Sequence, residues 1–461
     1  MTDNSNSGRE QSAANTGRMN RRTFLKTASA GTATTAVAGC ASLLGGDGGD
    51  GGDGDGGGST GGDGQVGTDP IPAGMLTFTQ GAAGVLGVQA QRGAELAVQR
   101  INDAGGIAGQ REVQLDVADE AEDALSKYRT FIDEGKMATF GPISSGTHES
   151  LAPEVESQEV VNVSSDGTVT SLYEDTVPDP TYSFRFQNYD VMETVAMAQE
   201  AVERIGAENI DTVAGVNPNY TFGEDEMSGF TQAIQNLTGA EVVYEGFPDL
   251  GASDMSTHIS EINSTEPDVV FSSLWGGDVT TFLRQANSRD MFDSVEGVFG
   301  SVFYSAAADV PADAISADNI FSGSRNFYWD FPDIGQWPPG QDLFDAAAQQ
   351  DDIVVPTAHY MSGYGAVAAW ASAVEKAIRM LGEFPSQQQI AMMLEEHGFM
   401  TPAGYHQMGA DHQCRSNAFS GQMIYSEDVG AAVLEDVNIF SAPQVSPPVG
   451  QNASDWLSGW N

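Results

Sequence analysis

The amino-acid sequence predicts an α/β protein with two Rossmann-like lobes, each built on a parallel central sheet, joined by hinge crossovers. From Met75 onward, short segments with alternating apolar residues take turns with longer segments whose apolar residues recur every three to four positions. Strictly alternating strands and helices are typical of parallel sheets with right-handed crossovers and helices on both faces. The alternation forms two series, before and after residue 188, so we expect two sheets.

The first series contains four expected strands with helices between them. The helices follow from apolar residues that share one face, as in the segment 90–101, which ends in a glycine-containing turn. The expected strands are residues 75–78, 113–117, 137–140 and 160–163, and the expected helices carry the apolar positions of 90–101, 125–132 and 151–155.

The second series repeats this pattern, and an aromatic, proline-rich segment at 323–340 then suits a crossover between lobes. In open α/β sheets ligands bind at the carboxyl ends of the strands, so two facing lobes predict a shared cleft that closes by a hinge motion. The expected helices are 192–205, 226–237, 255–262, 279–286, 362–381 and 386–396, and the expected strands are 212–216, 241–244, 268–271 and 297–299.

The first 40 residues have the pattern of an export signal. Arg21 and Arg22 precede a short, mildly apolar run at 27–38, and Cys40 follows small residues as in a lipobox. The run is too short to span a membrane, which takes about 20 apolar residues. The glycine- and aspartate-rich segment 45–64 cannot pack a core and predicts a flexible tether. We therefore expect twin-arginine export and a lipid on Cys40.

These patterns divide the chain into five predicted parts. The glycine-rich tether separates the signal from the folded body, and the crossovers assign the later segments to the two lobes. We expect a twin-arginine lipoprotein signal peptide at 1–39, a lipidated tether at 40–70, an N-terminal lobe at 71–188 with 325–412, a C-terminal lobe at 189–324 with 413–445, and a tail at 446–461.

The charge balance is strongly acidic. The formal net charge is −46, and removal of the signal peptide would make it −49. Nucleic-acid binding is excluded, because the phosphate backbone demands basic patches. Since 40% of the residues are hydrophobic, the acidity does not indicate a disordered chain. It favours a surface adapted to molar salt, where the screening length is about 3 Å and like charges repel little. Only four lysines occur, which also suits a halophile.

The chain has two cysteines, and lipidation of Cys40 would leave Cys414 without a disulfide partner. A catalytic thiol beside His406 or His412 is one interpretation, and a packed cysteine is the favoured one. No P-loop, no metalloprotease motif and no Cys/His metal cluster occurs in the sequence, so we expect no cofactor and no metal.

Five motifs, in order, resemble the branched-chain amino-acid-binding (Leu/Ile/Val-binding-like) family of ABC transporter substrate-binding proteins. These motifs are the GAELAV…INDAGGI segment at 93–107, GPISSG at 141–146, VSS at 163–165, NYTFG at 219–223 and PDVVF at 267–271. The resemblance covers residues 75–302 well and residues 360–424 loosely. It implies the periplasmic binding protein type I fold.

Carried over by position, the resemblance implies a set of ligand contacts. Serines that open a helix can hold a carboxylate or another polar head through hydroxyls and backbone amides. An aromatic side chain supplies apolar area of defined shape. The loop 81–87 is expected at the mouth of the site. The implied ligand-binding residues are Ser144, Ser145, Gly146, Gly167, Thr168, Tyr220 and Trp275.

One departure from the family concerns the ligand. Its amino-acid binders place a glutamate near the strand that matches residues 298–303, where it pairs with the ammonium group of the ligand. This stretch has no carboxylate here, and Asp166 or Asp278 could substitute. Besides a branched-chain or other amino acid, the possible ligands therefore include urea, short amides and carboxylic acids.

The resemblance implies a monomeric, lipid-anchored binding protein on the extracellular face of the cytoplasmic membrane. It would deliver a small polar ligand to the permease subunits of an ABC importer by closure of two lobes, without catalysis. One alternative is a ligand-sensing receptor, which would need a spanning helix and a cytoplasmic module. Another is an exported hydrolase using Ser145 with His148, although no orienting acid and no nucleophile elbow are evident.

Overall fold

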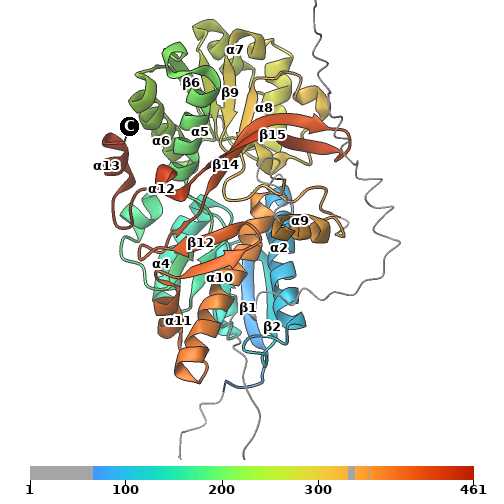
Figure 1. Ribbon diagram of the computed structural model, residues 1–461, viewed down its shortest axis with the longest axis vertical. Coiled ribbons are helices and arrows are strands. Elements are labelled where there is room, and N and C mark those ends of the chain that lie inside the picture. Colours follow the sequence, from blue (N-terminus) through green and yellow to red (C-terminus); the bar gives the residue numbers. More distant parts are fainter. Residues whose placement is uncertain (1–65, 82, 331–337, 351, 461) are drawn as a thin grey trace, which may run out of the picture. The chain divides into compact units, whose positions relative to one another are not determined.

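The computed structural model describes residues 66–81, 83–330, 338–350 and 352–460 (Figure 1). The predicted signal peptide, Cys40 and most of the predicted tether lie outside these residues. Within them, no helix combines the length and the apolar character needed to cross a membrane.

The first sheet has five strands, all parallel, in the order β2-β1-β3-β4-β5. Most residues of its three central strands are buried, as expected for a parallel sheet with both faces covered. The strands are β1 (Ile71–Thr77), β2 (Val113–Asp119), β3 (Ala138–Phe140), β4 (Asn162–Ser164) and β5 (Ser183–Arg185).

The helices around the first sheet include two that pack backbone against backbone. α2 and α10 lie side by side in Figure 1, and a Cβ atom on Gly93 would lie 1.8 Å from the carbonyl oxygen of Tyr360. A Cβ atom on Gly363 would be equally close to the carbonyl oxygen of Ala90, so the contact needs glycine on both helices. The helices are α2 (Gly84–Asp103), α3 (Ala124–Asp133), α4 (Ser145–Gln158), α10 (Ala358–Leu381) and α11 (Gln387–Leu394).

The second sheet has seven strands in the order β15-β14-β10-β9-β8-β6-β7. β6 to β9 are parallel, as the alternating pattern predicts. β10, which was not predicted, adds a further parallel strand, and β14 and β15 extend the sheet as an antiparallel pair. The strands are β6 (Thr212–Val216), β7 (Glu241–Gly246), β8 (Val269–Ser272), β9 (Gly297–Gly300), β10 (Ile320–Gly323), β14 (Ala418–Ser426) and β15 (Ala431–Phe440).

Four longer helices belong to this second series, and each begins close to its predicted position. α6 begins at Thr221, whereas the predicted helix began at residue 226. The prediction missed the first turn because this turn is largely polar and carries little apolar periodicity. The helices are α5 (Asp190–Ile205), α6 (Thr221–Thr238), α7 (Ser256–Thr265) and α8 (Gly277–Asn287).

Several smaller elements were not predicted from the sequence. The antiparallel strands beyond residue 397 are short or only partly alternating in burial, which weakens their signal. They are a three-stranded sheet of β11 (Gly398–Thr401), β12 (Gly404–Met408) and β13 (Cys414–Arg415), the helices α9 (Pro338–Ala347), α12 (Ala442–Val445) and α13 (Ala453–Ser458), and the short turns η1 (Leu172–Thr176), η2 (Ala207–Asn209), η3 (Met291–Ser294), η4 (Phe303–Ala306) and η5 (Ala312–Ala314).

Three segments of the chain connect elements of the first lobe with the second sheet. They follow β5, β10 and β13, and the segment after β10 begins with Ser324 and Arg325. The lobe boundaries given above remain predictions.

Candidate ligand-binding site

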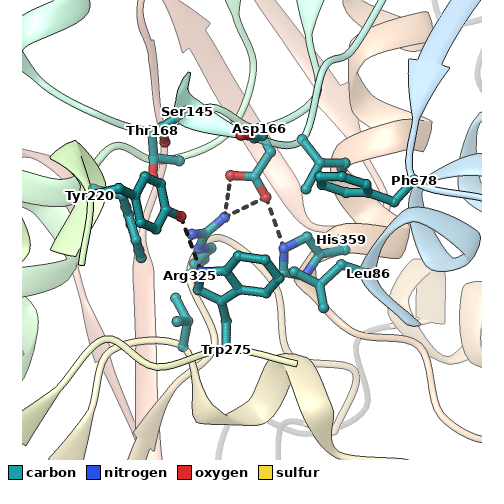
Figure 2. Close-up of a pocket in the computed structure, with 13 residues that line it drawn as sticks. Phe78, Leu86, Ser145, Asp166, Thr168, Tyr220, Trp275, Arg325 and His359 are labelled. Carbon is teal, nitrogen blue, oxygen red and sulfur yellow. Dashed lines mark hydrogen bonds and ion pairs between the residues drawn. The ribbon is translucent and has the colours of Figure 1, made fainter. Parts of the chain in front are cut away.

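The carboxyl ends of strands from both sheets contribute to one pocket (Figure 2). Segments after β1, β3 and β4 supply residues from the first sheet, and segments after β6, β8, β9 and β10 supply residues from the second. This is where open α/β sheets bind ligands. The pocket is lined by Phe78, Leu86, Ile143, Ser144, Ser145, Asp166, Thr168, Tyr220, Phe222, Trp275, Val302, Arg325 and His359.

The amino end of α4 contributes the serines. The Ser144 side chain caps this helix by accepting a hydrogen bond from the Thr147 amide at 3.4 Å. The Glu120 carboxylate accepts hydrogen bonds from the amides of Ile143 and Ser144, each at 2.8 Å. In the described structure no hydrogen bond engages the amides of Ser145 and Gly146, the next two along the chain. Two donors at a helix amino end thus stay available to an anion.

The loop after β4 places Thr168 in the pocket. Gly167 has a φ of +73°, and a Cβ atom there would lie 2.6 Å from Nδ1 of His148, so glycine is required. Its amide donates to the Ile143 carbonyl at 3.0 Å, and its carbonyl accepts from Nη1 of Arg185 at 2.9 Å. Thr168 is 1% exposed, and its hydroxyl has no hydrogen-bond partner. A buried hydroxyl without a partner can form a hydrogen bond with a ligand or a water that enters the pocket.

A buried ion pair occupies one side of the pocket. Nη1 of Arg325 donates to both carboxylate oxygens of Asp166 at 2.6 Å, and Nε2 of His359 lies 2.9 Å from the same carboxylate. Figure 2 shows Asp166 pointing toward both partners. Burial alone would raise the pKa of Asp166, but Arg325 and His359 lower it to about 2. Burial lowers the pKa of His359, so the imidazole is neutral at pH 7.

Arg325 also contacts an acid on helix α5. Its Nε lies 3.0 Å from Oε1 of Glu193, although the two groups are not aligned as a hydrogen bond. Burial raises the pKa of Glu193 to about 7, with Arg325 opposing that shift. Burial and the charge of Glu193 raise the pKa of Glu226 well above its ordinary value. Arg325, from the crossover after β10, therefore bridges the loop after β4 and a buried acidic pair behind it.

The opposite side of the pocket is aromatic and apolar. The indole nitrogen of Trp275 donates to the Tyr220 hydroxyl at 3.1 Å, which fixes the two rings relative to each other (Figure 2). The Tyr220 ring also packs against Phe222, with centroids 5.9 Å apart. Burial raises the pKa of Tyr220, so its hydroxyl keeps its proton. These rings can enclose an apolar ligand body.

The free space within the pocket is small, about 30 Å³ for water-sized molecules. No cluster of three metal-binding side chains occurs among the described residues.

Most of the residues that the resemblance implied come together here. Gly146 and Gly167 lie beside the pocket without lining it. Leu86 comes from the segment 81–87 that was expected as a loop at the mouth, but α2 begins at Gly84, so Leu86 lies in the first turn of a helix. Asp278 lies outside the lining and accepts from the Gly251 amide at 3.0 Å. The implied residues that line the pocket are Ser144, Ser145, Thr168, Tyr220 and Trp275.

Arg325 and His359 were missed by the sequence reasoning. Neither lies in one of the five motifs, and each is brought to Asp166 by the tertiary fold. One signal was available for Arg325, because a lone arginine in an aromatic, proline-rich crossover is unusual in a chain with 19 basic residues.

The geometry does not favour the catalytic alternatives. Nδ1 of His148 lies 3.2 Å from the Gly167 carbonyl, and no hydrogen bond joins His148 to Ser145 in the described structure. Burial lowers the pKa of His148 to about 3, below the range of a general base at pH 7. Burial raises the pKa of Cys414 to about 12, so its thiol is protonated and inert.

Comparisons with known proteins agree with this fold. Residues 70–426 match the sequence profile of a family described as periplasmic binding protein. A Leu/Ile/Val-binding protein homologue of Brucella abortus (strain 2308) is 24% identical over 333 residues, which are 70% of this chain and 82% of that protein.

Solved structures share the fold. A solute-binding protein of an ABC transporter from R. palustris, in complex with 4-hydroxybenzoate, aligns with a TM-score of 0.69 at 15% identity over 81% of this chain and 97% of its own. A leucine-binding protein from Thermotoga maritima aligns with a TM-score of 0.67 at 17% identity over 81% of this chain and 99% of its own. The chain belongs to the periplasmic binding protein family, with the type I fold of the branched-chain amino-acid-binding group.

Proposed function

We propose that this protein is an extracytoplasmic, lipid-anchored solute-binding protein that delivers a small polar ligand to the permease subunits of an ABC importer. The ligand is released unchanged, and the protein acts as a monomer. The observation that supports this most is a single pocket to which strand ends of both sheets contribute, with unpaired donors on one side and aromatic rings on the other.

Ligand binding in this proposal closes the predicted N-terminal lobe (71–188 with 325–412) onto the predicted C-terminal lobe (189–324 with 413–445). Ser144, Ser145 and Thr168 hold the polar head, and Tyr220 and Trp275 cover it. Gly146 contributes its amide, and Gly167 shapes the loop. An amino acid, an amide, urea and a carboxylic acid all present a polar head of suitable size.

A thermal-shift screen with these compounds in high salt tests binding, because a ligand that binds the folded state raises its melting midpoint. X-ray scattering with and without the stabilising compound tests closure. Consumption of the compound, or lobes that stay equally open, would contradict the proposal.

The lipid anchor rests on Cys40 and the export on Arg21 and Arg22. We expect Cys40→Ala to yield protein that is no longer lipidated and leaves the membrane fraction, and lysine at both Arg21 and Arg22 to keep the protein inside the cell. Detergent partitioning and cell fractionation measure both. Unchanged membrane association of the Cys40→Ala protein would rule out the anchor.

A further inference from the structure

The pocket has no acidic side chain left to bind a cationic group. Asp166 is the one acidic residue among those that line the pocket in the described structure. Its carboxylate already accepts two hydrogen bonds from Arg325 at 2.6 Å, and His359 lies 2.9 Å away. Both Asp166 and Arg325 are about 95% buried, so the pair is held in a medium where opposite charges attract strongly. The negative charge of Asp166 is therefore compensated before any ligand enters.

Most polar groups without partners at this pocket can donate a hydrogen bond, and Nδ1 of His359 is the one acceptor without a partner among the side chains that line it in the described structure. The amides of Ser145 and Gly146 begin helix α4 without a hydrogen bond, and Thr168 has a buried hydroxyl without a partner. Among the described residues, no hydrogen bond involves Nη2 of Arg325. The Thr168 hydroxyl is independent of the helix end, because it comes from the loop after β4. These donors come from three segments, and all but the Gly146 amide belong to residues that line the pocket.

We propose that the ligand is a small ionised carboxylic acid with an apolar body and no ammonium group. This inference rests on the proposed function and narrows its ligand class. The carboxylate accepts hydrogen bonds from the helix amides, from Thr168 and from Arg325. The apolar body packs between Phe78 and Leu86 on one side and Phe222 and Trp275 on the other.

An α-amino acid is disfavoured by its own charge. Its carboxylate and ammonium groups are close together, so the ammonium group would sit among the donors and near the Arg325 guanidinium. A charged group that leaves water without a partner pays a large desolvation cost. We expect an acid to bind at least about tenfold more tightly than the amino acid with the same side chain, a difference of about 1.4 kcal/mol.

Matched pairs of compounds isolate the ammonium group. Calorimetry of the full folded protein in about 3 M salt compares 4-methylpentanoate with leucine, and 3-phenylpropanoate with phenylalanine. 4-Methylpentanamide tests whether the negative charge matters, and benzoate tests a rigid ring. The proposal is supported if 4-methylpentanoate binds at least tenfold more tightly than both leucine and 4-methylpentanamide. It is also supported if 3-phenylpropanoate binds at least tenfold more tightly than phenylalanine.

The opposite results separate this inference from the proposed function. Equal or tighter binding of leucine or phenylalanine overturns the acid assignment and leaves the solute-binding function intact. Binding of the amide as tight as that of the acid, or no binding of any of these acids, also overturns it. Conversion of a bound compound into a product would overturn the proposed function itself. Because the comparison uses the unmodified protein, it does not depend on a variant that folds.

Discussion

The two sides of the pocket are both built at the carboxyl ends of strands, but one side is mainly polar and the other is mainly aromatic and apolar. The segments after β3 and β4 of the first sheet contribute hydroxyls, free amides and a carboxylate, whereas the segments after β6, β8 and β9 of the second contribute Tyr220, Phe222, Trp275 and Val302. Arg325, after β10, adds a cation to the polar side, and Phe78 and Leu86 add apolar surface from the first sheet, so the polar groups and the aromatic groups are only mostly divided between the two sheets.

Helix amino ends explain why the polar half belongs to the first sheet. α4 has no acidic residue in its first turn, and Glu120 accepts only from the Ile143 and Ser144 amides, so the Ser145 and Gly146 amides stay available to a ligand. α5, by contrast, has Asp190 and Glu193 in its first turn, and α6 has Glu224. An anion therefore finds free helix donors at α4 and acidic residues at the amino ends of α5 and α6.

Replacement of Arg325 should have the largest effect on ligand binding, because it removes the cation that compensates the negative charge of Asp166. We expect Arg325→Gln to weaken acid binding by about a hundredfold or more, since the truncation removes a donor and leaves Asp166 uncompensated. Loss of one partner of a buried pair also costs about 3–5 kcal/mol of stability. Calorimetry and thermal melting measure the two effects. Arg289→Gln, at an exposed position, is the matched control for one lost charge. Unchanged acid affinity in a folded Arg325→Gln protein would contradict this assignment.

Thr168→Val tests the polar half without disturbing the charges. The hydroxyl has no partner in the structure, so an apolar side chain of the same shape should leave the melting midpoint unchanged or raise it. Acid affinity should fall, because a hydrogen bond to a charged group contributes about 1.5–3 kcal/mol, or one to two decades. Ser145→Ala should act in the same direction.

The control for Thr168→Val is Thr231→Val on helix α6. Thr231 also has a buried hydroxyl atom without a partner, but it does not line the pocket. It should change stability in the same direction and leave acid affinity as it was. Equal losses of affinity in both variants would show that the effect of Thr168→Val is not local.

The resemblance to the binding-protein family implied much of the site, and the fold gives a physical reason why these residues lie together. Ser144, Ser145 and Thr168 lie just beyond β3 and β4, and parallel strands end at one edge of their sheet, so their proximity follows from topology. The ion pair was not predictable in this way. Arg325 and Asp166 are 159 residues apart, and their contact depends on how a crossover packs over the pocket. Likewise, β14 and β15 pair in antiparallel fashion after the βα alternation has ended, where periodicity gives no register.

Trp275→Ala tests the aromatic half and should weaken acid binding about tenfold. It removes apolar contact and the hydrogen bond that orients Tyr220 at 3.1 Å. Trp275→Phe keeps an aromatic ring and loses that hydrogen bond and part of the contact area, so its effect should be smaller. Both should leave the preference for an acid over its amino acid unchanged, since that preference arises in the polar half. A Trp275→Ala protein that loses the preference would break the comparison between the halves. Trp460→Ala, outside the pocket lining, is the control.

The smallest predicted effect is a pH dependence of acid affinity. It arises from buried acids that contact the polar side of the pocket from outside its lining. Burial raises the pKa of Glu193 to about 7, so below pH 7 this acid is mostly protonated and Arg325 faces Asp166 alone. Acid affinity should therefore rise a few-fold as the pH falls from about 8.5 to 6. Burial also raises the pKa of Glu120 to about 7, beneath the α4 amides, and it acts in the same direction. The pKa of Asp166, lowered to about 2, keeps this group from titrating in this window.

Glu193→Gln distinguishes the contribution of Glu193 to the pH dependence from that of Glu120. It should remove the part of the pH dependence that comes through Arg325 and leave the part due to Glu120. Stability should respond too. Because the folded pKa of Glu193 lies above its unfolded value of about 4.5, its contribution is fully present below that value and is lost as the pH rises through about 7. The wild-type melting midpoint should thus fall between pH 6 and 8.5 more steeply than that of Glu193→Gln. Calorimetry and melting at both pH values, in constant high salt, measure these slopes. Parallel slopes for the two proteins would show that Glu193 does not influence the polar half through Arg325.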